Sequence, residues 1–270
     1  MKIIFTFFMM LSLLGANAQQ DPGDIFGARS TGSGEPQPLV EPQSDPGLIQ
    51  SLSGVLLIDE GFEDITSLPG WFMQNNSSPV GSTGWFQGNT SVFSAFDGAT
   101  NAYIAANFNN GGGISTISNW LLTPEVDLKN GDVFSFWTRC PAGSIWPDRL
   151  ELRLSLNANA TNVGLLPTDV GDFTTLLLSV NPTLAQGGYP DTWAQYQVVL
   201  SGIPANSTGR FALRYYVSNG GSSGTNSDYI GIDRVQFYAE TVAVPLRAWA
   251  VFAGLSLMAL FVLLRARKLV

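Results

Sequence analysis

The side chains that could carry chemistry in this sequence are carboxylates, because the chain contains no histidine. Without histidine there is no Ser-His-Asp or Cys-His nucleophile, no HExxH metalloprotease and no His-ligated zinc. A glycosidase that works with two carboxylates needs only Asp or Glu, so the 21 acidic residues leave that reaction open. No acidic pair is singled out by its spacing, and the sequence therefore favours a protein that is not an enzyme.

Two tryptophans stand out as candidates for ligand binding. Trp146 and Trp193 lie in predicted loops, next to Pro and Asp residues. Aromatic rings in loops can stack on sugar rings, and they can equally close the end of a β-sandwich. The sequence leaves both alternatives open.

The charge of the chain restricts its partners. The whole sequence carries a net charge of −8. Five of the 13 basic residues lie in the two ends, so the part between Gln19 and Leu246 has eight basic against 21 acidic residues, a net charge of −13. Such a surface repels phosphate backbones, which excludes nucleic acid as a partner, and it favours bound cations.

Cys140 is the single cysteine, so no internal disulfide can form. It is either a buried thiol without a function or a residue that crosslinks two chains.

The elements that must position these residues are strands. Helical periodicity is absent from the central region, and short apolar segments alternate with clusters of Gly, Asn, Ser and Pro, which is the pattern of an antiparallel sandwich. In 149–155, leucines alternate with charged residues, which predicts one core face and one solvent-exposed face. The predicted strands are 55–58, 102–108, 119–123, 132–139, 149–155, 174–180, 195–200, 210–218 and 229–238.

The last predicted strand has a break in its alternation. Ile230 and Ile232 share one face, whereas Val235 and Phe237 follow the opposite phase. A slip of one residue near Asp233 and Arg234 predicts a β-bulge, and bulges redirect side chains.

Residues 19–54 precede the strands and read as a linker. This segment holds five prolines among Gly, Ser, Gln and Glu, with few large apolar residues. Such a composition cannot offset the entropy of ordering, so the linker is expected to be disordered or extended.

The central part resembles the choice-of-anchor J domain over residues 55–240. Its ordered landmarks are Gly61-Phe62-Glu63-Asp64, Leu68-Pro69-Gly70-Trp71, Thr83-Gly84-Trp85, Asn119-Trp120-Leu121-Leu122-Thr123-Pro124, the segment 148–155, Gly209-Arg210-Phe211 and the segment 228–233. This family looks related to cleaved-adhesin and MAM domains. The resemblance implies an all-β fold, an antiparallel jelly-roll β-sandwich of the MAM or galactose-binding kind, that acts in adhesion or surface binding.

The same resemblance suggests a metal site. In related jelly rolls, a Phe-Glu near the first strand and an Asp in the last strand share a structural calcium ion, and the matching residues here are Glu63 and Asp233. Because calcium takes 6–8 oxygen ligands, Asp97 is a further tentative ligand. The alternative is that these acids are ordinary polar groups, with Arg234 as an ion-pair partner.

The two ends predict export and anchoring. Residues 1–18 have a positive start, an apolar run and an Ala-Asn-Ala site, which together are typical of a signal peptide. Residues 248–264 carry no charge and are followed by two arginines and a lysine, which predicts a transmembrane helix with its basic end in the cytoplasm. Val244, Pro245 and Trp249 make the segment 244–270 resemble a PEP-CTERM sorting signal, which implies cleavage by an exosortase-type protease.

These features together predict an exported surface module that is anchored in the membrane or released to the cell surface. The leading interpretation is a non-enzymatic module that binds glycan or matrix. The alternative is a structural protein of the envelope or biofilm matrix that recognises no small ligand, and the carboxylate glycosidase is the least favoured reading.

Overall fold

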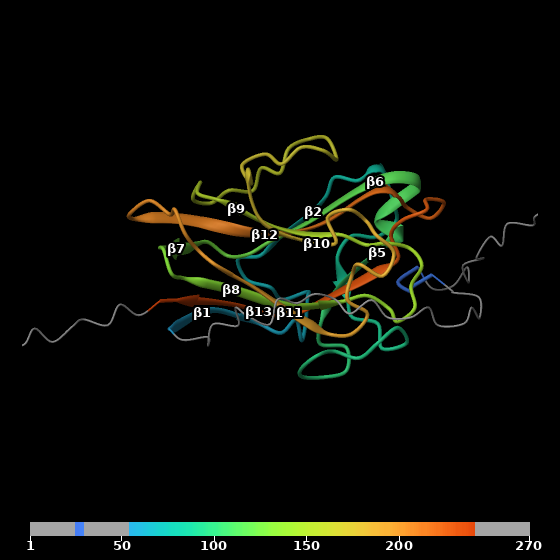
Figure 1. The fold of residues 1–270 in the computed structure, drawn as a ribbon, viewed down its shortest axis with the longest axis horizontal. Coiled ribbons are helices and arrows are strands. Elements are labelled where there is room, and N and C mark those ends of the chain that lie inside the picture. Colours follow the sequence, from blue (N-terminus) through green and yellow to red (C-terminus); the bar gives the residue numbers. More distant parts are fainter. Residues whose placement is uncertain (1–24, 30–53, 241–270) are drawn as a thin grey trace, which may run out of the picture.

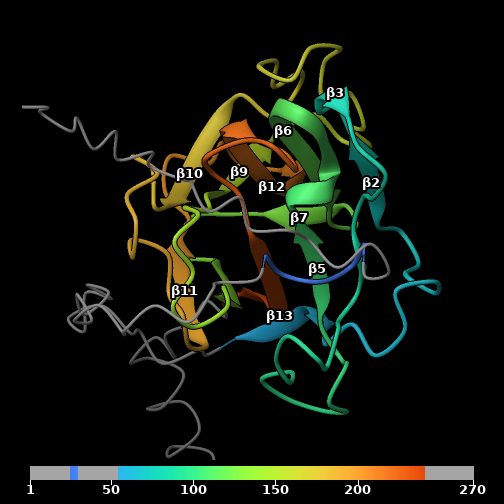
Figure 2. The same ribbon diagram turned by 90° about the vertical axis from the view of Figure 1, so that its right-hand side faces the viewer.

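The computed structural model describes residues 25–29 and 54–240, which form two antiparallel β-sheets packed face to face. Figure 1 shows the sheets as two layers, and Figure 2 shows the same layers after a quarter turn. The prediction of an all-β antiparallel sandwich is thus confirmed.

The six-stranded sheet has the order β11-β8-β13-β5-β4, with β1 paired to β13. Its strands are β1 (Val55–Glu60), β4 (Phe86–Gln87), β5 (Ile104–Asn107), β8 (Val133–Arg139), β11 (Ala194–Val199) and β13 (Tyr229–Ala239).

The seven-stranded sheet has the order β10-β9-β12-β6-β2, with β3 paired to β6 and β7 paired to β12. Its strands are β2 (Phe72–Asn75), β3 (Ser78–Val80), β6 (Gly111–Leu122), β7 (Val126–Leu128), β9 (Leu150–Ser155), β10 (Thr175–Val180) and β12 (Ser207–Gly220), and a 3-10 turn, η1 (Phe108–Asn110), precedes β6.

All nine predicted strands are present, with boundaries that shift by a few residues and with β6 and β12 longer than predicted. The sequence pattern does not predict β2, β3, β4 and β7, which have two to four residues each. Such short strands show too few alternations to be recognised from the pattern alone.

The main core lies between the two sheets and is rich in aromatic side chains. Phe211 of β12 contacts Phe134 of β8 and Phe237 of β13, with ring centroids 4.4 and 5.1 Å apart. Leu150 and Leu152 of β9 are buried in the same core, as their alternation predicts.

The prediction of a solvent-exposed second face for β9 is wrong. Glu151 is buried there, and its carboxylate contacts Arg214 of β12 at 3.3 Å. The segment 157–173 covers this outer face, because its Ala160, Val163 and Phe173 pack with Trp120 and its neighbours. The long connection between β9 and β10 thus covers the ion pair of Glu151 and Arg214 and buries it.

The predicted bulge in β13 is confirmed. The pairing of β13 with β8 shifts register between Asp233 and Gln236, and Arg234 has a φ of 53°. As a result Ile232 and Val235, on either side of the bulge, both reach the core.

Residues 25–29 fall within the segment 19–54 that the composition predicts to be a disordered or extended linker, yet they lie against the sandwich. Asn107 donates side-chain hydrogen bonds to the carbonyls of Ile25 and Gly27, both at 2.9 Å. This contact is not predicted from the composition, because the segment contains few large apolar residues. The rest of the linker lies outside the described residues.

The predicted features of the two ends also lie outside the described residues, namely the signal peptide 1–18, the sorting residues Val244, Pro245 and Trp249, and the span 248–264. Within residues 25–29 and 54–240, no helix has the length and apolar character needed to cross a membrane.

Candidate ligand-binding face

The outer side of the six-stranded sheet carries the residues best placed to meet a ligand. Side chains alternate along β8, so that Phe134 and Phe136 enter the core while Trp137 points outward. Asp233 lies directly opposite Trp137 on the neighbouring strand β13. Residues paired in this way project from the same face of a sheet, so the indole and the carboxylate are neighbours.

A turn between β4 and β5 packs on this pair. The ring of Phe96 stacks on Trp137, with a centroid distance of 3.8 Å and an interplanar angle of 14°. The backbone amides of Phe96 and Asp97 donate to Asp233 Oδ2 at 2.8 and 3.1 Å. Asp233 therefore holds the turn that places Phe96 over Trp137.

The bulge contributes the third hydrogen bond to this carboxylate. The amide of Arg234 donates to Asp233 Oδ1 at 2.6 Å, so both carboxylate oxygens accept backbone hydrogen bonds. Burial raises the pKa of Asp233 to about 6, although the hydrogen bonds from the amides of Asp97, Phe96 and Arg234 oppose the shift.

Trp193 stands at the edge of the same area. Its indole N–H donates to the carbonyl of Ser94 at 3.0 Å, and its ring meets Phe96 edge-on at a centroid distance of 6.5 Å. The ring also meets Phe93 edge-on at 5.6 Å. We call Phe96, Trp137 and Trp193 the aromatic platform.

The support beneath the platform depends on a glycine. Phe93 and Tyr103 pack on the backbone of β13 at Gly231, where an added Cβ would lie 2.8 and 2.9 Å from their rings. A side chain at this position would lift both rings and the turn that follows Phe93.

Polar and charged groups border the platform. Gln195 of β11 lies opposite Trp137 on its other side. Arg234 contacts Asp97 at 3.4 Å, and Gln236 donates to Asp59 at 2.9 Å.

Phe96 itself is 41% exposed. The area thus combines an accessible aromatic ring with amides and charges, as sites for polar ligands do.

The structure brings the three tentative calcium ligands to one turn. An added Cβ at Gly98 would lie 3.7 Å from Glu63 Oε1, and Asp233 holds the amides just before it. Asp97, however, faces the guanidinium of Arg234, and both Asp233 oxygens already accept N–H groups. Among residues 25–29 and 54–240, no three acidic or cysteine side chains are grouped to hold a metal.

Trp146 does not belong to the platform. It lies in the β8–β9 connection, where the guanidinium carbon of Arg29 sits 5.1 Å from the centre of its ring. The two predicted tryptophans therefore have different neighbours, and only Trp193 lies beside Phe96.

The sequence analysis did not single out Phe96 or Trp137. A signal for Trp137 exists, since this large apolar residue occupies the outward phase of a strand whose inward phase is Phe134 and Phe136. Phe96 lies in an irregular turn, and no periodic pattern marks it.

Another pair of acidic residues, Asp148 and Asp228, lies close together in the interior. The amide of Asp228 donates to Asp148 Oδ1 at 2.9 Å, and Tyr215 donates to the same oxygen at 2.5 Å. Each aspartate is only 1% exposed, and burial raises the pKa of both, that of Asp228 to about 6. A polysaccharide chain could not reach this pair as it lies here.

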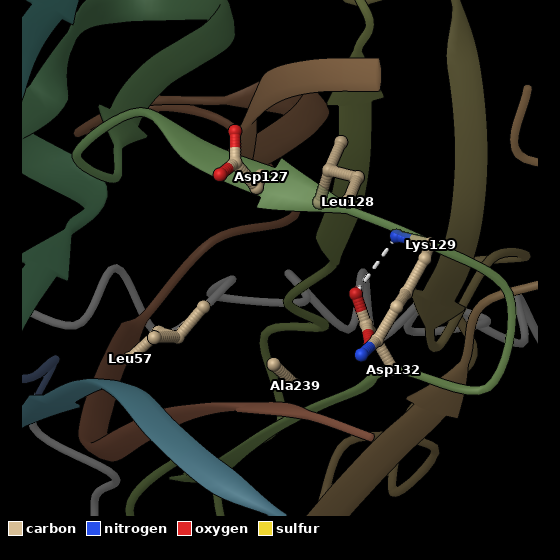
Figure 3. Close-up of a pocket in the computed structure, with 6 residues that line it drawn as sticks. All are labelled: Leu57, Asp127, Leu128, Lys129, Asp132 and Ala239. Atoms are coloured by element: carbon tan, nitrogen blue, oxygen red, sulfur yellow. Dashed lines mark hydrogen bonds between the residues drawn. The ribbon is translucent and has the colours of Figure 1, made fainter. Parts of the chain in front are cut away.

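Two hollows of the surface are alternatives to the platform. A cavity of about 220 Å3 lies between β7 and the ends of β1 and β13, and Figure 3 shows its lining residues Leu57, Asp127, Leu128, Lys129, Asp132 and Ala239. Its Asp132 is engaged, because Oδ2 accepts the amide of Lys129 at 2.8 Å.

The second hollow is a groove of about 530 Å3 beside Phe26, Phe86 and residues 87–90. The amide group of Gln87 is occupied, since it accepts the amide of Ile65 at 3.1 Å and donates to the carbonyl of Phe62 at 2.7 Å.

Comparisons with known proteins show similarity of this chain to solved structures only. Neither a family model nor a curated protein matches it. Among solved structures, the K1 cleaved adhesin domain of Lys-gingipain from Porphyromonas gingivalis W83 is 24% identical, covering 70% of this chain and 100% of that chain, with a TM-score of 0.48.

Two further solved structures are similar to the chain at lower scores. The K3 cleaved adhesin domain of the same Lys-gingipain is 21% identical over 68% of this chain and 98% of its own, with a TM-score of 0.44. The CBM22-1 xylan-binding domain of Paenibacillus barcinonensis Xyn10C is 16% identical over 72% of this chain and 100% of its own, with a TM-score of 0.36. With TM-scores below 0.5, these likenesses carry no conclusion about function.

Proposed function

We propose that this protein is a non-enzymatic binding module of the cell surface and that its aromatic platform binds glycan. The observation that carries the proposal is the stacked pair Phe96 and Trp137 on the outer face of the six-stranded sheet. Its neighbours Asp97, Gln195 and Arg234 supply hydrogen-bonding groups at the border.

This combination suits a sugar ring. The apolar side of a pyranose packs on an aromatic face, while its hydroxyl groups need donors and acceptors around that face. One face of the Phe96 ring stacks on Trp137. Since Phe96 is partly exposed, a sugar can pack on its opposite face. The ordered domain landmarks between Gly61 and Asp233 support the same kind of module.

We infer the location of the module from the two ends of the chain. The signal-like start and the uncharged segment 248–264 with its basic end support export and anchoring in the membrane. The Val244-Pro245 motif supports processing by an exosortase-type protease, which would release the domain to the surface or extracellular matrix.

A glycan array with the full chain tests the proposal. We expect saturable binding that weakens by about two- to tenfold in Phe96→Ala, because stacking on one ring is worth about 0.5–1.5 kcal/mol. Binding should also weaken in Trp137→Ala, because this substitution removes the ring on which Phe96 stacks. Ile114→Ala is the matched control, since this residue is exposed on the other sheet.

The remaining outcomes decide between the alternatives. Binding that survives both aromatic substitutions would move the site away from the platform. A wild-type chain that binds no glycan would favour the structural protein of the envelope or biofilm matrix. Release of products from a bound glycan, lost on replacing one carboxylate, would show a glycosidase.

A further inference from the structure

The segment Ile25–Arg29, which we call the strap, lies against the sandwich, begins with a turn at Ile25 and Phe26, and is held by Arg29. The guanidinium donates to the backbone carbonyl of Gly221 and, at 3.0 and 3.4 Å, to those of Gly224 and Asn226. These carbonyls belong to the connection between β12 and β13, nearly 200 residues away in sequence. The connection therefore presents a set of acceptors to one positive group.

Two aromatic rings complete the surroundings of the guanidinium. Its central carbon lies 4.9 Å from the ring centre of Phe108 and 5.1 Å from that of Trp146. The planar guanidinium can stack on aromatic rings and at the same time donate hydrogen bonds to several carbonyls. A lysine ammonium lacks this planar set of donors.

The sandwich also recognises the backbone of the strap. Asp228 Oδ1 accepts the amide of Arg29 at 2.6 Å, and Asn109 donates to the carbonyl of Ile25 at 2.7 Å. Asn107 binds two carbonyls of the strap, and the ring of Phe26 packs on Phe86 at 5.0 Å. Strap contacts thus reach side chains of η1, β4, β5 and the β12–β13 connection.

Two buried carboxyl groups lie behind the arginine. Asp148 and Asp228 are each 1% exposed, and the Oδ2 atom of each has no hydrogen-bond partner among the described residues. Burial disfavours two neighbouring carboxylates, and Arg29 is the positive group that offsets both. The two acids and the carbonyls of the β12–β13 connection thus surround Arg29 with acceptors.

We propose that this end of the sandwich is a receptor site for an arginine-bearing peptide, occupied here by the protein's own residues 25–29. The ligand class is a peptide with an aromatic residue three positions before an arginine, as Phe26 and Arg29 are arranged. This inference is independent of the glycan platform, because the two sites share no residue.

The peptide can come from the same chain or from a second copy. Residues 30–53, a run of 24 residues, connect the strap to β1. At about 3.3 Å per residue this run reaches up to about 80 Å, enough to place the strap on a neighbouring molecule. Both sources present the same chemistry to the receptor.

The test supplies the strap in trans. The full chain with Arg29→Ala is titrated with a synthetic peptide of residues 24–30, Asp-Ile-Phe-Gly-Ala-Arg-Ser, by calorimetry and by tryptophan fluorescence. We expect saturable binding, a change in Trp146 emission and a rise of the melting temperature toward the wild-type value. The same peptide with alanine in place of arginine should do none of these.

Arg149→Ala is the matched control, because Arg149 also lies over an aromatic ring, Tyr216, and binds backbone carbonyls. That variant keeps its own strap, so the peptide should not bind to it. If Arg29→Ala fails to fold, Arg29→Lys takes its place, since lysine keeps the charge and loses the fork of donors.

The outcomes separate cleanly. If Arg29→Ala lowers the melting temperature but does not bind the peptide, the proposal is overturned, because Arg29 then only stabilises the fold. An unchanged melting temperature without peptide binding would overturn it as well. Sedimentation of the wild-type chain distinguishes the sources: a monomer fills its own site, whereas a dimer that Arg29→Ala abolishes exchanges straps between copies.

Discussion

Asp233 and Trp137 face each other across β13 and β8, and one turn of the chain, Phe96-Asp97, contacts both of them. The carboxylate accepts the amides of that turn, and the indole stacks with its phenyl ring. The bulge at Arg234 adds a third amide to the carboxylate. The position of the accessible aromatic ring therefore depends on a buried acid.

Replacing Asp233 should loosen the platform. In Asp233→Ala the amides of Phe96, Asp97 and Arg234 lose their acceptor, and we expect a loss of roughly 1–3 kcal/mol in the free energy of unfolding. Urea unfolding measures the loss, and glycan affinity should fall with it. Asp127→Ala, at an exposed acid of β7, is the control and should change neither quantity.

Calcium binding at Glu63, Asp97 and Asp233 is a prediction that thermal unfolding can decide. Because Arg234 occupies the approach to Asp97, we expect equal melting temperatures of the full chain in calcium and in chelator. A rise with calcium that Glu63→Gln or Asp233→Asn removes would establish the ion site, and would require Arg234 to move away from Asp97.

The buried aspartates should make stability depend on pH. Burial raises the folded-state pKa of Asp228 and of Asp233 to about 6, above the ordinary value of about 3.8. Between these values the folded chain binds more protons than the unfolded chain, so stability falls as the pH rises from about 4 to about 6. We therefore expect these groups to make the chain more stable at pH 5.5 than at pH 7.5.

Denaturant unfolding at the two pH values measures this difference. Asp228→Asn keeps an oxygen that can accept the Arg29 amide but removes the titration, so the difference should shrink in this variant. The exposed Asp127→Asn serves as its control. Higher stability at pH 7.5 than at pH 5.5 would contradict the assignment.

Cys140 should be unreactive in the folded chain. Its thiol is buried, and that burial, followed by the nearby charges of Asp148 and Asp228, raises its pKa well above the ordinary value. A thiol reagent at pH 8 should label the native chain very slowly and the denatured chain at once. Rapid labelling of the native protein would instead support the crosslinking role that the sequence left open.

The sequence alone determined the class of fold and the positions of nine strands along the chain. The leucines of β9 alternate with charged residues because strand side chains alternate between faces, and the break in β13 marks the bulge for the same reason. These are properties of neighbouring residues, which the linear sequence displays directly. The lack of histidine likewise excluded whole classes of chemistry without any structure.

Only the tertiary structure decided which residues meet. Phe96 and Trp137 are 41 positions apart, and Arg29 reaches carbonyls of the β12–β13 connection nearly 200 positions away. Such contacts depend on how the loops cross the outer faces of the sheets, and loops carry no periodic signal. The charged face of β9 shows the same point, since its pattern predicted solvent and the segment 157–173 covers it. Whether a side chain is buried depends on the segments that pack on it, so the residues of one strand do not determine its burial.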